Sequence, residues 1–277
     1  MQKVRKAVFP VAGYGTRFLP ATKSIPKEML PIVDKPVIHY AAEEAVRAGI
    51  DTLIFITGRQ KRAIEDYFDA APELEAALRA KGKDEAADIV HAILPQGVNC
   101  IFIRQSMQLG LGHAVLCAAP ALANEPFAVL LADDFLGLDG QDFLKDMVQA
   151  YEETNLSQIG VMPIDGPDIS RYGVVKPGPG KNEVLGLIEK PSAETAPSNL
   201  ASIGRYVLAP RVIDILRDLA PGVGGEIQLA DAINILASQP DAGVQSRMLT
   251  TPRFDCGQIR GYLDAILHVA DRRKSPR

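Results

Sequence analysis

Ala7–Tyr40 reads AVFPVAGYGTRFLPATKSIPKEMLPIVDKPVIHY, and this stretch decides the fold. It begins with an apolar run at 7–12, which predicts a buried strand that breaks into a loop at Gly13-Tyr-Gly15. Prolines at positions 20, 26, 31 and 36 keep the loop out of a helix, because each lacks a backbone donor and restrains the residue before it. Apolar residues at helical spacing then predict a helix over 36–49.

Strand and helix patterns alternate beyond that helix. Strands are expected at 52–57, 101–104 and 127–131, with helices at 60–68 and 73–93 between them. This alternation predicts a parallel sheet with right-handed crossovers. Asp133 and Asp134 follow the last of these strands, at the sheet edge where open α/β folds bind ligands.

The second half of the chain has a different pattern. Beyond residue 158 it becomes strand-rich and mixed, without an internal repeat or a flexible linker. We therefore expect one domain over 1–277, an α/β fold in three layers with a mixed, mostly parallel central sheet flanked by helices. Residues up to about 157 would form a nucleotide-binding half, and 158–277 would add the acceptor side of the pocket and the last helices.

Composition narrows the functional class. Apolar residues make up 47% of the chain and charged residues 23%, and the net charge of −4 argues against binding a nucleic-acid backbone. No apolar run approaches the length of a membrane span, and the basic N-terminus lacks the apolar core of a signal peptide. Three widely spaced cysteines fit reduced thiols, so a cytoplasmic protein is expected.

The glycine-containing loop carries three cations, Arg17, Lys23 and Lys27. Glycines let backbone amides approach a phosphate, and several cations on a proline-stiffened segment suit a polyphosphate. A dinucleotide-binding fingerprint fails, because position 18 is Phe rather than Gly and no helix follows the turn. A Walker A sequence is absent as well.

The Ala7–Tyr40 segment closely resembles the signature of the nucleoside-diphosphate-sugar pyrophosphorylases, and within them the bacterial UTP–glucose-1-phosphate uridylyltransferases. Further stretches resemble motifs of that family in the same order. They are RQSMQLGLGHAVLCA (104–118), LLADD (130–134), YGVV (172–175), IEKP (188–191), APSNLASIGRYVL (196–208), GEIQLADAI (225–233) and FDCG (254–257). The resemblance covers nearly the whole chain and implies the Rossmann-like nucleotide-diphospho-sugar transferase fold.

The resemblance implies transfer of a uridylyl group from UTP to glucose-1-phosphate, which gives UDP-glucose and pyrophosphate. A phosphate oxygen of the sugar phosphate attacks the α-phosphorus, so the reaction needs cations and positioning more than a protein nucleophile. Mg²⁺ is the implied cofactor. A dTTP-dependent thymidylyltransferase and a non-catalytic regulatory or binding homologue are the alternatives.

Residue roles follow from the same resemblance. Arg17 and Lys27 are expected to bind the phosphates, with Lys23 as a weaker candidate, while Asp133 and Asp255 would ligate the metal. Nucleotide contacts are expected from Ala12, Gly13, Gly15, Thr16, Gln105 and Gly110, among which the Gln105 amide would pair with uracil. Sugar-phosphate contacts are expected from Glu28, Gly173, Glu189, Lys190, Asn199 and Glu226.

Some residues keep a structural interpretation. Glu28 could equally orient Lys27 or brace the loop, and His113 could cap or pack at a helix start. The charged run 73–88 resembles an extra helical segment of the uridylyltransferases. We also expect a homo-oligomer, either a dimer or a tetramer built from dimers.

Overall fold

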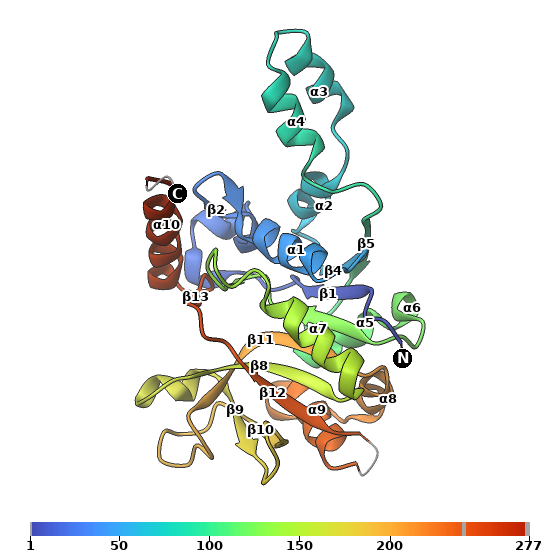
Figure 1. Ribbon diagram of the computed structural model, residues 1–277, viewed down its shortest axis with the longest axis vertical. Coiled ribbons are helices and arrows are strands. Elements are labelled where there is room, and N and C mark those ends of the chain that lie inside the picture. Colours follow the sequence, from blue (N-terminus) through green and yellow to red (C-terminus); the bar gives the residue numbers. More distant parts are fainter. Residues whose placement is uncertain (1, 240–241, 275–277) are drawn as a thin grey trace.

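A nine-stranded mixed sheet forms the centre of the computed structural model, which describes residues 2–239 and 242–274 (Figure 1). Its continuous path runs β10-β9-β11-β6-β1-β4-β5, and β8 joins through β11 and carries β12. The strands are β1 (Lys6–Pro10), β4 (Thr52–Thr57), β5 (Asn99–Arg104), β6 (Phe127–Leu130), β8 (Ser157–Pro163), β9 (Gly173–Pro177), β10 (Val184–Glu189), β11 (Leu200–Leu208) and β12 (Val244–Met248).

The two halves of the chain contribute different pairings to this sheet. β6, β1, β4 and β5 are parallel neighbours, as the alternation of strands and helices predicts. β11 pairs antiparallel with β6, β8 and β9, and β9 pairs antiparallel with β10. The predicted fold class, with a mixed sheet flanked by helices, is confirmed.

Helices cover both faces and complete three layers. They are α1 (Val37–Arg47), α2 (Arg62–Phe68), α3 (Pro72–Arg79), α4 (Asp84–His91), α5 (Leu111–Cys117), α6 (Ala119–Leu122), α7 (Phe143–Thr154), α8 (Arg211–Asp218), α9 (Leu229–Ala237) and α10 (Ile259–Lys274). Successive residues of β1 point to opposite faces, so Phe9 packs with α1, α2 and α7, whereas Val8 packs with α5, α8 and α9.

The charged stretch predicted as one helix over 73–93 is two helices. Gly82, at φ 68°, turns the chain between α3 and α4, a backbone conformation that suits glycine. The two helices pack on each other and stand clear of the body at the top of Figure 1. No residue of this hairpin lines either cavity that borders the loop after β1 or the acidic pair Asp133–Asp134.

Two short ribbons lie outside the main sheet, and the first of them connects distant parts of the chain. β7 (Asp134–Phe135) pairs antiparallel with β13 (Phe254–Asp255), and β2 (Pro31–Ile32) pairs with β3 (Lys35–Pro36). α10 follows β13 and lies beside β2 in Figure 1. The first ribbon therefore brings the FDCG stretch to the acidic pair after β6. Within the described residues, no helix combines the length and apolarity needed to cross a bilayer.

Candidate active site

The loop after β1 folds as three short 3-10 turns, Thr16–Phe18, Ala21–Lys23 and Lys27–Met29. The carbonyl of Gly15 accepts a hydrogen bond of 2.7 Å from Thr22 Oγ1, which closes the loop on itself. Gly15 has φ 68°, and a methyl group there would lie 3.1 Å from Cβ of Lys27. Glycine at this position therefore lets the Lys27 stem pack against the loop.

Lys27 forms an ion pair with Asp133, which lies 106 positions further along the chain. Burial alone would lower the pKa of Lys27, but the charges of Asp133 and Glu28 and the hydrogen bond to Asp133 together raise that pKa to about 12. Burial would raise the pKa of Asp133, and the Lys27 charge instead holds it below its ordinary value. Both groups are therefore charged at neutral pH.

Asp133 and Asp255 border one small space beside Gly257. A methyl group placed at Gly257 would lie 2.7 Å from Asp133 Oδ2 and 3.0 Å from Asp255 Oδ1. The β7–β13 ribbon sets this arrangement, with the Cys256 amide donating to the Asp133 carbonyl at 2.8 Å. Arg17 reaches the same turn through its Nη1, which lies 3.4 Å from the Gly257 carbonyl. The tertiary structure thus brings together four of the five residues expected to bind phosphate and metal, all except the weaker candidate Lys23.

Asp134 and Arg253 form a buried ion pair beneath this cluster. Burial raises the pKa of Asp134 to about 6, with Arg253 opposing that shift and Asp133 adding to it. Arg253 also donates to Tyr172 Oη at 2.9 Å and lies over the Tyr172 ring. Sequence reasoning gave Arg253 and Tyr172 no role; their places next to FDCG and YGVV were the available signal.

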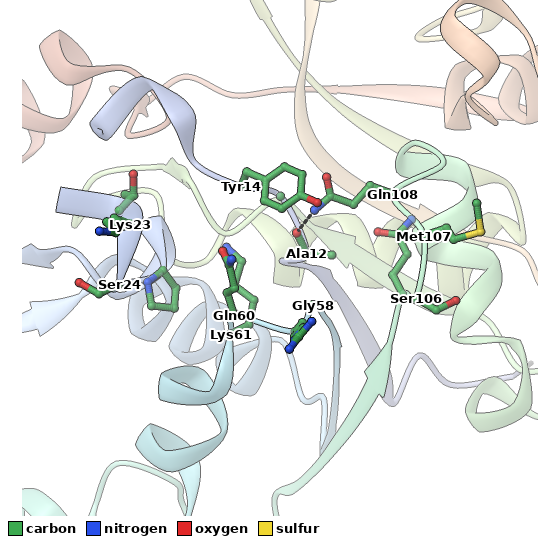
Figure 2. Close-up of a pocket in the computed structure, with 15 residues that line it drawn as sticks. Ala12, Tyr14, Lys23, Ser24, Gly58, Gln60, Lys61, Ser106, Met107 and Gln108 are labelled. Carbon is green, nitrogen blue, oxygen red and sulfur yellow. Dashed lines mark hydrogen bonds between the residues drawn. The ribbon is translucent and has the colours of Figure 1, made fainter. Parts of the chain in front are cut away.

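A cavity of about 610 Å³ lies between the loop after β1 and the 58–61 and 105–108 segments (Figure 2). Ala12, Gly13 and Gln105 line it, as expected for nucleotide contacts, and so does Lys23. Gln108 Nε2 donates to the Ala12 carbonyl at 2.6 Å, the dashed contact in Figure 2. The opposite wall comes from 58–61, which the sequence did not single out.

A second cavity, of about 450 Å³, borders the cluster directly. Arg17, Asp133, Asp134, Asp255 and Arg253 line it, together with three of the expected sugar-phosphate residues, Gly173, Glu189 and Lys190. A methyl group at Gly173 would lie 3.2 Å from Glu189 Oε2, so glycine keeps this wall open. Lys190 Nζ lies 3.2 Å from Glu189 Oε1.

Lys27 lines neither cavity itself but has a neighbour in each. Its neighbour Pro26 lines the first cavity, and its partner Asp133 lines the second. A ligand with three phosphates in the first cavity and a ligand in the second would therefore share one cationic centre.

Three residues expected at the sugar phosphate lie elsewhere. Glu28 is 2% exposed and accepts a 2.6 Å hydrogen bond from Lys61, so it braces the loop and faces neither cavity. Exposed Asn199 donates to Asp165 Oδ1 at 3.0 Å, and exposed Glu226 accepts from Gln228 at 2.7 Å. Glu28 points away from the cavities because the buried ammonium group of Lys61 needs a carboxylate partner.

Gly110 and Thr16 also line neither cavity. Gly110 has φ 98°, and its Cβ position is 2.7 Å from the Ile227 carbonyl. It therefore allows close packing of the 109–112 turn on the 226–228 segment, whose Ile227 amide donates to the Leu109 carbonyl at 2.7 Å. Gly110 is still linked to the first cavity, because its carbonyl accepts a hydrogen bond of 3.1 Å from Nε2 of Gln105, which lines that cavity.

The family model described as nucleotidyl transferase matches residues 6–272. The chain is 47% identical over 273 residues to UTP–glucose-1-phosphate uridylyltransferase 2 of Staphylococcus saprophyticus, covering 98% of this chain and 93% of that protein.

Solved structures show the same similarity. A UTP-bound UGPase from Acinetobacter baumannii has a TM-score of 0.88 and 42% identity, covering 96% of this chain and 93% of that one. A UDP-glucose pyrophosphorylase complexed with UDP-glucose has a TM-score of 0.85 and 40% identity, covering 97% and 99%. The chain therefore belongs to the nucleotidyl transferase family and, within it, to the UTP–glucose-1-phosphate uridylyltransferases.

Proposed function

We propose that the protein transfers the uridylyl group of UTP to glucose-1-phosphate, producing UDP-glucose and pyrophosphate. The observation that carries this proposal is the cluster of Arg17, Lys27, Asp133 and Asp255: three of these residues line the second cavity, and Pro26, next to Lys27 in the chain, lines the first. Two anionic substrates bound in these cavities would present an attacking phosphate oxygen and an α-phosphorus to each other. Positioning of this kind supplies much of the rate enhancement in reactions without a protein nucleophile.

The cations have separate tasks in this mechanism. Lys27 keeps its charge, because Asp133 and Glu28 together raise its pKa to about 12 against the effect of burial, and it offsets the negative charge that builds up at the α-phosphate. Arg17, at the edge of the second cavity, would bind the pyrophosphate part as that group leaves. The attacking sugar phosphate is already ionised, so no general base is required.

Divalent metal fits the space beside Gly257. Two carboxylates border it, and Mg²⁺ commonly takes one or two carboxylates, keeping its other positions for water and phosphate oxygens. No group of three or more His, Cys, Asp or Glu side chains suited to a metal occurs among the described residues. Asp133 and Asp255 would hold Mg²⁺, which neutralises phosphate charge when bound.

The second cavity suits a sugar phosphate. Lys190 supplies a cation for the phosphate and Glu189 an acceptor for sugar hydroxyls, while Gly173 leaves room for the ring. Arg171 also lines this cavity, with Nη2 3.5 Å from Asp255 Oδ2. Asn199 and Glu226 could join only after moving from their present partners.

The two halves of the chain would divide the substrates between them. All residues that line the first cavity lie between 12 and 108, and most that line the second lie beyond 170. The proposed unit is thus one domain, with a nucleotide half up to about 157 and a sugar-phosphate half from 158 to 277.

A homo-oligomer, a dimer or a tetramer of dimers, is the proposed assembly. Ile259, Leu263 and Leu267 recur every fourth residue on α10 and are 56%, 49% and 60% exposed. Such an apolar stripe is costly in water and suits contact with a second copy. The cytoplasm is the proposed compartment, which three free cysteines fit.

The decisive experiment is a pyrophosphate-release assay with UTP, dTTP, CTP and ATP, each with glucose-1-phosphate or galactose-1-phosphate and Mg²⁺. We expect the highest kcat/KM with UTP and glucose-1-phosphate, and activity with dTTP within a modest factor, since one methyl group separates the bases. Faster turnover of dTTP would favour thymidylyl transfer. Absence of pyrophosphate release would favour a non-catalytic homologue.

A separate variant tests whether Asp133 and Asp255 bind the metal. Gly257→Ala fills the space between Asp133 and Asp255, so calorimetry should show weaker Mg²⁺ binding in the presence of UTP. Unchanged affinity would contradict the assignment.

A further inference from the structure

Gln105 is held rigidly at the end of β5, on the wall of the first cavity. It is 7% exposed, and its backbone amide donates to the Thr57 carbonyl at 2.9 Å. A side-chain amide has a donor end and an acceptor end, and the two ends select different bases. Which end faces the cavity therefore decides which nucleobase Gln105 can accept.

The surroundings of Nε2 fix this orientation. One neighbour is the Gly110 carbonyl at 3.1 Å, which can only accept, so the nitrogen end must point toward it. The other neighbour is His113 Nδ1 at 2.9 Å. Because Nε2 has only hydrogens to offer, Nδ1 must carry a lone pair, and neutral His113 then has its proton on Nε2.

Both hydrogens of the Gln105 amide are used by these two partners. The remaining polar atom, Oε1, is a pure acceptor on a residue that lines the cavity. Uracil offers an imide N3–H to such an acceptor. Cytosine has a lone pair at the same ring position, which an acceptor repels.

We propose that His113 is a specificity-determining positioning residue: by accepting a hydrogen bond from Gln105 Nε2, it keeps an acceptor turned toward the base and favours uracil over cytosine. This inference rests on the proposed uridylyl transfer. His113 lies in the first turn of α5. One turn later, Cys117 has its Sγ 3.9 Å from the same Nδ1.

The test compares His113→Leu, which removes the acceptor at similar volume, with His113→Asn, whose Oδ1 can replace Nδ1. His91→Leu is the matched control, because His91 lies on the exposed α3–α4 hairpin. For each variant, kcat/KM for UTP and for CTP is measured by pyrophosphate release. Calorimetry gives the Kd values of both nucleotides, and thermal melting checks the fold.

We expect His113→Leu to lower the ratio of kcat/KM for UTP to that for CTP about tenfold, which corresponds to the loss of one neutral hydrogen bond. The change should come mainly from a higher KM for UTP. His113→Asn should restore most of the ratio, and His91→Leu should leave it unchanged. Equal losses for both nucleotides, or an unchanged ratio in a folded His113→Leu, would overturn the inference.

Failure of the proposed function is distinguishable from failure of this inference. If the wild-type protein releases no pyrophosphate, uridylyl transfer fails, while the Kd ratios of the same variants still decide the role of His113. A wild-type protein that binds UTP no better than CTP overturns that role directly.

Discussion

Two ion pairs lie close together in this protein and differ in burial. Lys27 and Asp133, at the centre of the site, have side chains that are 21% and 24% exposed. Glu44 and Arg205, beneath it, are each 1% exposed. The first pair can exchange partners for a phosphate or a metal ion, because solvent reaches it. The second pair is sealed, so its charges can only serve the fold.

The sealed pair supports the open one. Arg205 donates to both carboxylate oxygens of Glu44, at 2.8–3.1 Å, and also to the carbonyls of Leu131 and Asp134, at 3.0 and 2.7 Å. Leu131 and Asp134 flank the residue that pairs with Lys27. The buried Glu44–Arg205 pair therefore fixes the backbone that carries Asp133, whose own charge can exchange partners.

Breaking the sealed pair should have the largest effect. Arg205→Met leaves the buried Glu44 carboxylate without its cation and removes a donor from the carbonyls of Leu131 and Asp134, so we expect a loss of about 3–5 kcal/mol in the free energy of unfolding. Burial already raises the pKa of Glu44 against the charge of Arg205, and the loss should shrink as acid protonates Glu44. Urea denaturation at several pH values measures this.

The double variant Glu44→Leu with Arg205→Met sharpens that result. It removes both charges, so it should be more stable than Arg205→Met alone. A double variant less stable than either single variant would show that the pair is not a sealed charge pair of the kind described.

Breaking the open pair should act on turnover instead. Lys27→Ala removes a fixed cation from the reacting phosphates, and we expect kcat to fall about 10²–10³-fold while the melting temperature stays near that of the wild type. Lys83→Ala, on the α3–α4 hairpin, is the matched control. Activity close to that of the wild type in Lys27→Ala would contradict the assigned role.

A third ionic contact, which Glu43 on α1 makes with His39 and Lys35, should have the smallest effect when it is broken. Burial alone would raise the pKa of Glu43, but hydrogen bonds from His39 and Lys35 lower it to about 2 from 4.5. A depressed pKa stabilises the fold above about pH 4.5, and that stabilisation is lost as pH falls toward 2. Glu43→Gln should flatten this part of the stability curve by less than about 1 kcal/mol, since the side chain is 38% exposed. An unaltered acid limb in urea titrations would argue against the pairing.

Local sequence predicted some elements well and others poorly. Thr52–Thr57 is a strand with the expected bounds, because a run of apolar β-formers between turn residues has few alternatives. The helix over 73–93 was wrong as one element, since a single glycine at position 82 divides it. α7 and β12 were not anticipated at all.

The site shows the same division. Arg17, Lys27, Asp133 and Asp255 could be picked out from their motifs, and the structure brings them together. Glu28 lies in the same motif, yet its carboxylate is 2.6 Å from the buried ammonium group of Lys61, 33 positions away. Its partner could not be found from local spacing, because the contact is made only when the 58–61 turn packs against the loop.

Sequence alone determined which residues could bind phosphate, metal and base, because residue type fixes charge and hydrogen-bonding capacity. It also determined the α/β class, because hydrophobic periodicity fixes which faces are buried. Only the tertiary structure decided which charges are open and which are sealed, and which end of the Gln105 amide is free. These properties depend on contacts between segments far apart in the chain, where burial changes what a charge or a hydrogen bond contributes.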